Sequence, residues 1–368
     1  MELTNYWFLV IWIFFGGALL FMVFPQKQEV VLGQNTNRWN IISATLLMLP
    51  YIIWAGFRGN FADTNAYRRI FFDAPSSLNQ ISDYVLANEH DQGFSVIMVV
   101  LKSIIGDSDT IFFLIIALFQ GICLIYVFRK YSSNYWISIY LFIISSNYIS
   151  WMFNGMRQFI AVCICFTCTG LMLKKKYIPL IIFILIASTI HGTAIIMIPL
   201  VFIAQGDAWN KKTLLLIIVT LVAITSVEHF TNLLDVFTTG TQYEGIMNSE
   251  VLVGDDGTNP IRVLVFSVPA IISFIGKRKI KNTNDDVINF CTNMSIITAA
   301  IYGISMVTSG ILLGRLPIYT LLYSYILLPW EIENIFSSKK LKRLIYMSMI
   351  VLYFGFFYYQ MHFAYGLI

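Results

Sequence analysis

Six arginines lie at the edges of apolar runs. They belong to polar segments that separate these runs, here called breaks, and these breaks contain no lysine. Arginine presents a planar fork of donors that grips a phosphate or carboxylate at two points, whereas lysine offers a compact point charge. These breaks therefore predict the binding of an anionic group. The six are Arg58, Arg68, Arg69, Arg157, Arg262 and Arg315.

Carboxylates and one histidine in the same breaks are candidates to accept a proton from a substrate hydroxyl. Asp63 precedes "TNAYRRIFF", where it either serves this chemistry or caps a helix. Glu89, Asp91 and Gln92 in "ANEHDQGFS" either contact a polar substrate or form a solvated loop. His191 lies in the apolar run "ASTIHGTAIIM", where an ionisable residue indicates function, with a satisfied core histidine as the alternative.

The break "NGMRQFIA" places Arg157 and Gln158 where an apolar run begins. An arginine at the membrane edge costs a few kcal/mol unless it is paired or snorkels to the surface. Arg315 in "GILLGRLPIY" repeats the pattern, with Tyr319 four residues on, and Arg262 in "NPIRV" resembles it more weakly. The competing interpretation of Arg68 and Arg69 is contact with lipid headgroups. The aromatic residues that could stack on sugar rings are Trp54, Tyr67, Trp151 and Tyr319.

The composition predicts the elements that must position these residues. The chain has 368 residues, 58% of them hydrophobic and 12% charged, against roughly 25% charged in soluble domains. Apolar runs recur from end to end, so we expect an all-α polytopic membrane protein with about twelve transmembrane helices in a single domain, 1–368. The predicted spans are 5–24, 39–57, 110–128, 135–152, 156–173, 177–190, 193–205, 213–229, 259–276, 286–308, 313–331 and 343–361.

The lysines predict the orientation. Every lysine except Lys102 falls in an alternate set of breaks, which the positive-inside rule assigns to the cytoplasm. The arginine breaks then face outward and line a cavity. Residues 58–109 form an outward loop, in which 64–71 is an amphipathic helix on the membrane surface. Residues 93–105 either dip into the membrane or lie in its interface, with Lys102 snorkelling.

Neither a metal nor another cofactor is expected. The outward breaks lack an Asp-x-Asp motif, apart from the weak exception "GDDG" at 254. Cys163, Cys165 and Cys168 in "CICFTC" have a metal-like spacing, but they lie in an apolar run, so we assign them a structural role. The pattern gives no indication of nucleic-acid binding.

Four segments in order, "FRGNFADTNAYRRIF", "DQGFSVIMVVLKSI", "MRQFIA" and "ASTIHGTAIIMIPLVF", resemble the EpsG family, and "GRLPIY" is similar to its C-terminal arginine segment. The resemblance implies a Wzy-like polysaccharide polymerase of the bacterial inner membrane, with a GT-C-like architecture. Such an enzyme transfers a glycan from undecaprenyl diphosphate to a hydroxyl of another lipid-linked repeat unit. The implied partners are these substrates, membrane lipids and, in the same pathway, a chain-length regulator and a flippase.

The resemblance assigns roles to the candidates. Arg157 and Arg315, assisted by Arg58, would neutralise the leaving diphosphate, and Asp63 or His191 would be the base, a choice that stays open. An O-acyltransferase or a single-sugar glycosyltransferase is the alternative, and a flippase of lipid-linked oligosaccharides is the third. The outward arginines favour a diphosphate substrate over an acyl donor from the cytoplasm.

Overall fold

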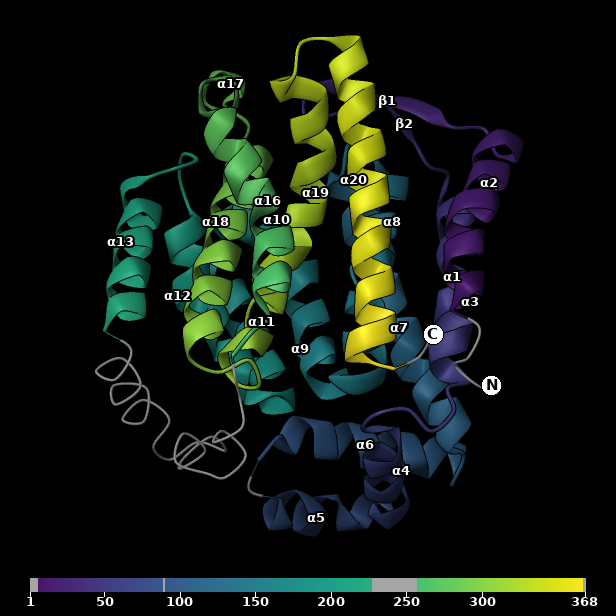
Figure 1. Cartoon of the computed structure of the whole chain (residues 1–368). Helices are drawn as coiled ribbons and strands as arrows, with labels where there is room; N and C mark the ends of the chain where they lie inside the picture. Colours follow the sequence, from purple (N-terminus) through teal and green to yellow (C-terminus); the bar gives the residue numbers. More distant parts are fainter. Residues whose placement is uncertain (1–5, 89, 227–256, 367–368) are drawn as a thin grey trace. The chain divides into compact units, whose positions relative to one another are not determined.

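The computed structural model describes residues 6–88, 90–226 and 257–366 (Figure 1). It is 78% helical, which confirms the all-α prediction. The chain divides into two compact units, which we call unit 1 (Met1–Ile195 with Phe336–Ile368) and unit 2 (Ile196–Ile335). The single transmembrane domain stays a prediction.

Unit 1 contains most of the predicted site. Its helices before the predicted outward loop are α1 (Trp7–Ile11), η1 (Trp12–Gly16), α2 (Gly17–Val23) and α3 (Ile41–Gly56). The loop holds α4 (Thr64–Asp73), η2 (Leu78–Gln80), α5 (Ile81–Ala87) and α6 (Gln92–Ile105). The helices after it are α7 (Asp109–Tyr131), α8 (Tyr135–Ile144), η3 (Tyr148–Asn154), α9 (Met156–Thr167), α10 (Thr169–Leu173), α11 (Tyr177–Ile190), α20 (Lys339–Tyr359) and η7 (Gln360–Ala364).

Unit 2 is formed by α12 (Met197–Ala204), α13 (Lys211–Thr225), α16 (Pro260–Ile275), α17 (Lys277–Thr283), α18 (Asp286–Val307), η6 (Leu313–Arg315) and α19 (Ile318–Ile335). A short 3-10 helix, η4 (Gly192–Ile196), joins α11 to α12. In the unit, α18 packs against α13, α16 and α19.

The described residues contain one β-sheet, which has two strands. Strands β1 (Lys27–Val31) and β2 (Gln34–Arg38) pair antiparallel, with Lys27 opposite Arg38. The two turn residues, Leu32 and Gly33, have φ of +54° and +71°. A two-residue hairpin turn needs such positive φ values, because only then does its twist match that of the strands.

Three helices of the described chain are long and apolar enough to cross a membrane: α7, α18, and α20 continued by η7. The number rises to five if each bent pair is one span: α8 with η3, bent by 70°, and α16 with α17, bent by 72°. The first bend falls at the polar residues Ser145–Asn147, where Ser146 has φ +66°. Several other predicted spans form apolar helices of 10–17 residues, so the prediction of about twelve spans is not confirmed.

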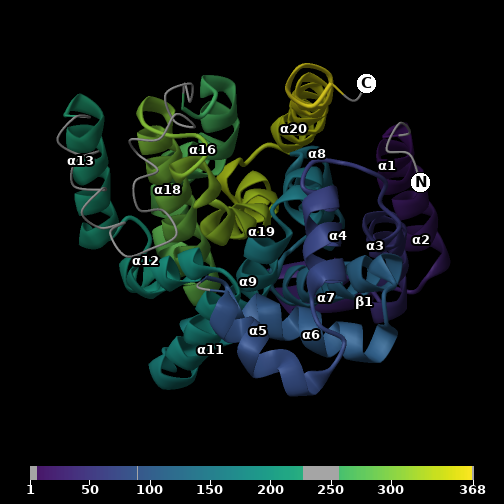
Figure 2. The ribbon, with the colours of Figure 1, turned by 90° about the horizontal axis from the view of Figure 1, so that it is seen from below.

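The hairpin and the helices α4, α5 and α6 lie at opposite ends of unit 1 (Figure 1), and Figure 2 shows the unit from the end that carries these three helices. The first residue of α7, Asp109, pairs with Arg68 of α4, and Arg129 near its end donates to the Trp39 carbonyl beside β2. A helix of 23 residues is about 34 Å long, enough to cross a hydrocarbon core of about 30 Å.

Helix α4 confirms the helix predicted at 64–71, and its buried face carries Thr64, Tyr67 and Phe71. Asp63 occupies the predicted N-cap position, but its side chain makes no cap hydrogen bond. The 14 residues of α6 are too few for a span. Lys102 does not snorkel: it is buried, donates to the Phe71 carbonyl at 3.2 Å and pairs with Asp107 at 3.1 Å.

Candidate functional site

An ion pair joins two of the predicted site residues. Arg157, in the first turn of α9, places Nη1 2.9 Å from the Asp91 carboxylate. The Asp91 side chain is 4% exposed, whereas that of Arg157 is 37% exposed. Asp91 is the residue before α6, where its φ of +53° is an uncommon conformation that Asp tolerates better than most residues. The pair therefore links the N-termini of α6 and α9, and more than a third of the Arg157 side chain remains exposed.

Aromatic rings frame this pair. The Arg157 guanidinium lies 5.9 Å from the Tyr67 ring centre and 5.8 Å from that of Phe94, within cation–π range. Tyr67 and Phe94 belong to a buried cluster with Phe113 and Met156, formed by α4, α6, α7 and α9. The guanidinium is thus held against a rigid apolar core.

Burial raises the pKa of the Asp91 carboxyl, opposed by the charge of Arg157, the backbone N–H of Gly192 and the charge of His90. Removing a carboxylate from water disfavours its charged form, while a neighbouring cation or donor favours it. Asp91 is therefore a stronger proton acceptor than a solvated aspartate. Engagement of Arg157 by another anion would remove the main opposing interaction and raise this pKa further.

His191 lies beside this arrangement, because the backbone N–H of the next residue, Gly192, is near enough to Asp91 to lower the pKa of its carboxyl. It ends α11, and its Nδ1 is 2.7 Å from the Thr193 hydroxyl. The close packing of α6 on α11 explains the proximity: a Cβ added at Gly93 would lie 2.9 Å from the Thr189 carbonyl carbon. The structure therefore brings the "DQG" and "IHG" segments together.

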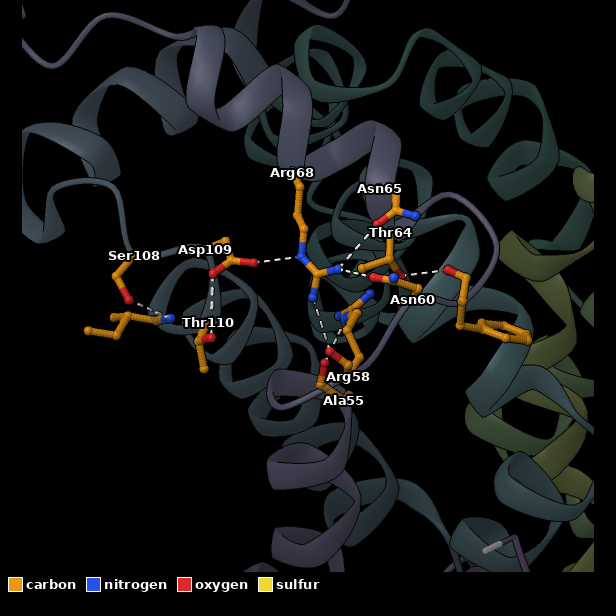
Figure 3. Close-up of polar contacts among 11 residues, drawn as sticks. Ala55, Arg58, Asn60, Thr64, Asn65, Arg68, Ser108, Asp109 and Thr110 are labelled. Atoms are coloured by element: carbon orange, nitrogen blue, oxygen red, sulfur yellow. Dashed lines mark hydrogen bonds and ion pairs between the residues drawn. The ribbon is translucent and has the colours of Figure 1, made fainter. Parts of the chain in front are cut away.

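A second polar network lies where α3, α4 and α7 meet, and Figure 3 shows Arg68 at its centre. Arg68 donates from Nε to Asp109 at 2.6 Å, from Nη1 to Asn60 and to Asn65, and from Nη2 to the Arg58 carbonyl at 3.3 Å. A single arginine thus ties the chain leaving α3 to the starts of α4 and α7.

Arg58 is buried, with 3% of its surface exposed. Its Nε donates to the Ala55 carbonyl at 2.7 Å, and its Nη1 to the Phe153 carbonyl at 3.1 Å. The rings of Phe113 and Phe153 lie 4.5 and 5.0 Å from the guanidinium. Burial lowers the pKa of Arg58 to about 9, which leaves the side chain charged at neutral pH. These contacts give Arg58 a structural role.

The other predicted residues of unit 1 are distributed around these two groups. Asp63 and Gln92 are exposed, and Gln158 is buried one residue beyond Arg157. Arg69 is exposed on α4. Glu89 lies outside the described residues, as does most of the "GDDG" motif at 254.

Arg262, Arg315 and Tyr319 belong to unit 2. Arg262 is half-buried in the first turn of α16, Arg315 is exposed in η6, and Tyr319 is buried in α19. Thr258 lies just before α16 and donates its backbone N–H to the Ser305 carbonyl. A Cβ added at Gly314, next to Arg315, would lie 2.5 Å from the Thr258 hydroxyl. The segments that carry Arg262 and Arg315 therefore meet at one end of unit 2.

Sequence reasoning missed three participants: Asp109, Phe113 and Thr193. Asp109 follows the N-cap Ser108 in "GDSDT", a helix start signal that also places a carboxylate at the predicted outer edge. Phe113 and Thr193 carry no comparable signal, because only the packing of α3 on α7 and the turn after α11 give them their partners.

The helices and this arginine-rich site define an α-helical, membrane-embedded protein. The profile of the EpsG family matches residues 41–367. The chain therefore belongs to the EpsG family, which makes it an exopolysaccharide-related membrane protein. Comparison with curated proteins and with solved structures finds no match.

Proposed function

We propose that this protein is a polysaccharide polymerase that acts at the outer face of the bacterial inner membrane. It would transfer a glycan from undecaprenyl diphosphate to a hydroxyl of a second lipid-linked repeat unit. The observation that carries the proposal is the Arg157–Asp91 pair, which combines a half-exposed anion-binding cation with a buried carboxylate. The twelve-span, GT-C-like architecture belongs to the same proposal.

The reaction needs two functions of the protein. The acceptor oxygen attacks the anomeric carbon, the bond from that carbon to the diphosphate oxygen breaks, and undecaprenyl diphosphate leaves with the bonding pair. A cation must stabilise the charge that develops on the leaving oxygen. A base must take the hydroxyl proton.

Arg157 suits the first function. Its guanidinium is held by Asp91 through one nitrogen, and more than a third of the side chain remains exposed. A fork of donors of this kind fits two oxygens of a diphosphate. Arg315, in unit 2, stays a separate candidate on the resemblance of "GRLPIY" to the family pattern, and Arg262 stays one on the charge pattern of the sequence.

Asp91 suits the second function, because burial raises the pKa of its carboxyl, and it is paired with Arg157, whereas Asp63 is exposed at the start of α4. The two functions are coupled in this arrangement. When the diphosphate engages Arg157, Asp91 loses its strongest counter-charge and becomes a better base. His191 would then position the adjacent Gly192, whose backbone N–H lowers the pKa of Asp91.

Complementation of a deletion strain, read as a ladder of lipid-linked glycans, tests the proposal. Arg157→Ala and Asp91→Asn should leave single repeat units, while Arg157→Lys should retain a shortened ladder at equal membrane expression. Arg69→Ala, which removes an exposed arginine of α4, is the matched control and should give the full ladder. A full ladder from both Arg157→Ala and Asp91→Asn would refute the assignment.

The same assay separates the two other functions. A deletion that keeps its ladder but loses an acyl group would indicate the O-acyltransferase. Loss of all surface glycan, with single units accumulating at the inner leaflet, would indicate a flippase.

A further inference from the structure

A cavity of about 470 Å³ lies in unit 1, away from the site described above. The last turns of α7, the α9–α10 junction and the start of α11 form it. Three of its lining residues are lysines, and none of the described residues that line it is acidic. The residues that matter are Tyr126, Lys130, Tyr131, Gly170, Lys174 and Lys176.

Lys130 is fixed at one wall of the cavity. Its Nζ is 3.1 Å from the Tyr126 hydroxyl, and it lies 5.2 Å from the Tyr126 ring centre and 5.1 Å from that of Tyr131. These contacts orient the ammonium group without neutralising its charge.

The backbone brings the other two lysines to the same cavity. Helix α10 ends in a turn at Lys175, whose φ is +53°, a conformation that costs a non-glycine residue roughly 1 kcal/mol. The N–H of Lys176 bonds to the Leu171 carbonyl at 3.0 Å, which reverses the chain. As a result Lys174 and Lys176 line the cavity, and Lys175 between them does not.

Within the described parts of the chain, none of these three lysines forms an ion pair with a carboxylate. Three ammonium groups around one cavity repel one another, so an anion there would be favoured. The cavity lies where α7 ends and α11 begins, at the end of unit 1 that carries the hairpin. Tyrosines and lysines at a helix end are typical of the membrane interface.

We propose that this cavity binds the phosphate of an anionic phospholipid from the adjacent leaflet. The lysines would hold the phosphate, the tyrosine hydroxyls the glycerol region, and the apolar part of the wall the start of the acyl chains. Basic pockets between helices on the cytoplasmic side of membrane proteins recognise lipid headgroups in this way. The site does not depend on the polymerase reaction.

Native mass spectrometry and thermal unfolding of the purified full-length protein test the proposal. Phosphatidylglycerol should remain bound and raise the apparent melting temperature, whereas phosphatidylcholine and inorganic phosphate should do neither. The double variant Lys174→Ala/Lys176→Ala should bind phosphatidylglycerol roughly 30-fold more weakly, as the loss of two lysine–phosphate contacts implies. Lys175→Ala, which removes one positive charge from the same turn but outside the cavity, should bind like wild type.

A second variant, Gly170→Leu, fills the cavity without changing its charge and is tested for lipid binding in the same way. Gly170→Leu adds a side chain whose Cβ would lie 3.0 Å from the Tyr131 hydroxyl, so it should fill the cavity and weaken lipid binding. Three results would overturn the proposal: equal loss in Lys175→Ala, which indicates unspecific surface charge; competition by inorganic phosphate alone; and equal binding of phosphatidylcholine.

Discussion

Replacement of Arg58 by methionine separates a structural role from a substrate-binding role for this residue. Methionine fills a similar apolar volume but removes the guanidinium. Two buried carbonyl oxygens, of Ala55 and Phe153, would then lose their donors. The Ala55 carbonyl lies in the last turn of α3, where helical carbonyls lack an intrahelical partner.

The cost follows from these contacts. Each unsatisfied buried carbonyl costs about 1–3 kcal/mol, and each lost ring contact about 0.5–1 kcal/mol. The substitution also removes a buried charge from the folded protein. This offsets part of the cost, because a buried ion carries a desolvation penalty of several kcal/mol. We expect a net loss of about 2–4 kcal/mol in the free energy of unfolding.

The measurement is the apparent melting temperature in detergent at a fixed scan rate, alongside the glycan ladder from cells grown at low temperature. Arg58→Met should melt several degrees below wild type yet retain the ladder. Arg69→Met, on the exposed side of α4, should change neither. An Arg58→Met protein that melts like wild type but makes no ladder would refute the structural role and restore Arg58 to the substrate site.

Three further predictions concern the contacts around the site. Gly93→Ala should lower the melting temperature, because its Cβ would meet Thr189 Oγ1 at 2.2 Å, while Gly355→Ala, with nothing within 4 Å, should not. Arg68→Ala and Asp109→Ala in a double-mutant cycle should show a coupling energy of about 1 kcal/mol, since both side chains are one-quarter exposed. Polymerisation in membranes should fall as the pH drops through the raised pKa of Asp91, because the protonated carboxyl cannot act as a base; a pH–rate profile without this acid limb would contradict the role.

The sequence was a good guide to the helices but a poor guide to their continuity. Hydropathy located α3, α7, α18 and α20 within a few residues, because burial and lipid exposure both require apolar side chains there. It did not reveal the break at Ser145–Asn147, since three small polar residues inside an apolar run change the mean hydropathy little. The bend depends on a positive φ at Ser146, which no composition encodes.

The same contrast holds for the site. Charge placed Arg157 and Asp91 among the candidates, because an ionisable residue at the edge of an apolar run stands out in a sequence. Their pairing across 66 positions was not predictable, since it depends on the packing of α6, α9 and α11 around Tyr67 and Phe94. Arg58 shows what the sequence alone leaves open: an arginine beside a span has the same signature whether it faces a substrate or two carbonyl oxygens.

The two arginines therefore illustrate what distinguishes a binding arginine from a structural one. Arg58 makes two bonds to main-chain carbonyls and is 3% exposed, so an anion could reach it only by breaking the junction of α3 with η3. Arg157 instead faces a carboxylate, and its side chain is 37% exposed, so an incoming diphosphate can replace one anionic partner by another with little rearrangement. Because the displaced partner is a buried aspartate, the exchange changes the basicity of a neighbouring group as well as the charge on the substrate. Under the proposed function, that coupling is what distinguishes the Arg157–Asp91 pair from the more numerous contacts around Arg58 and Arg68.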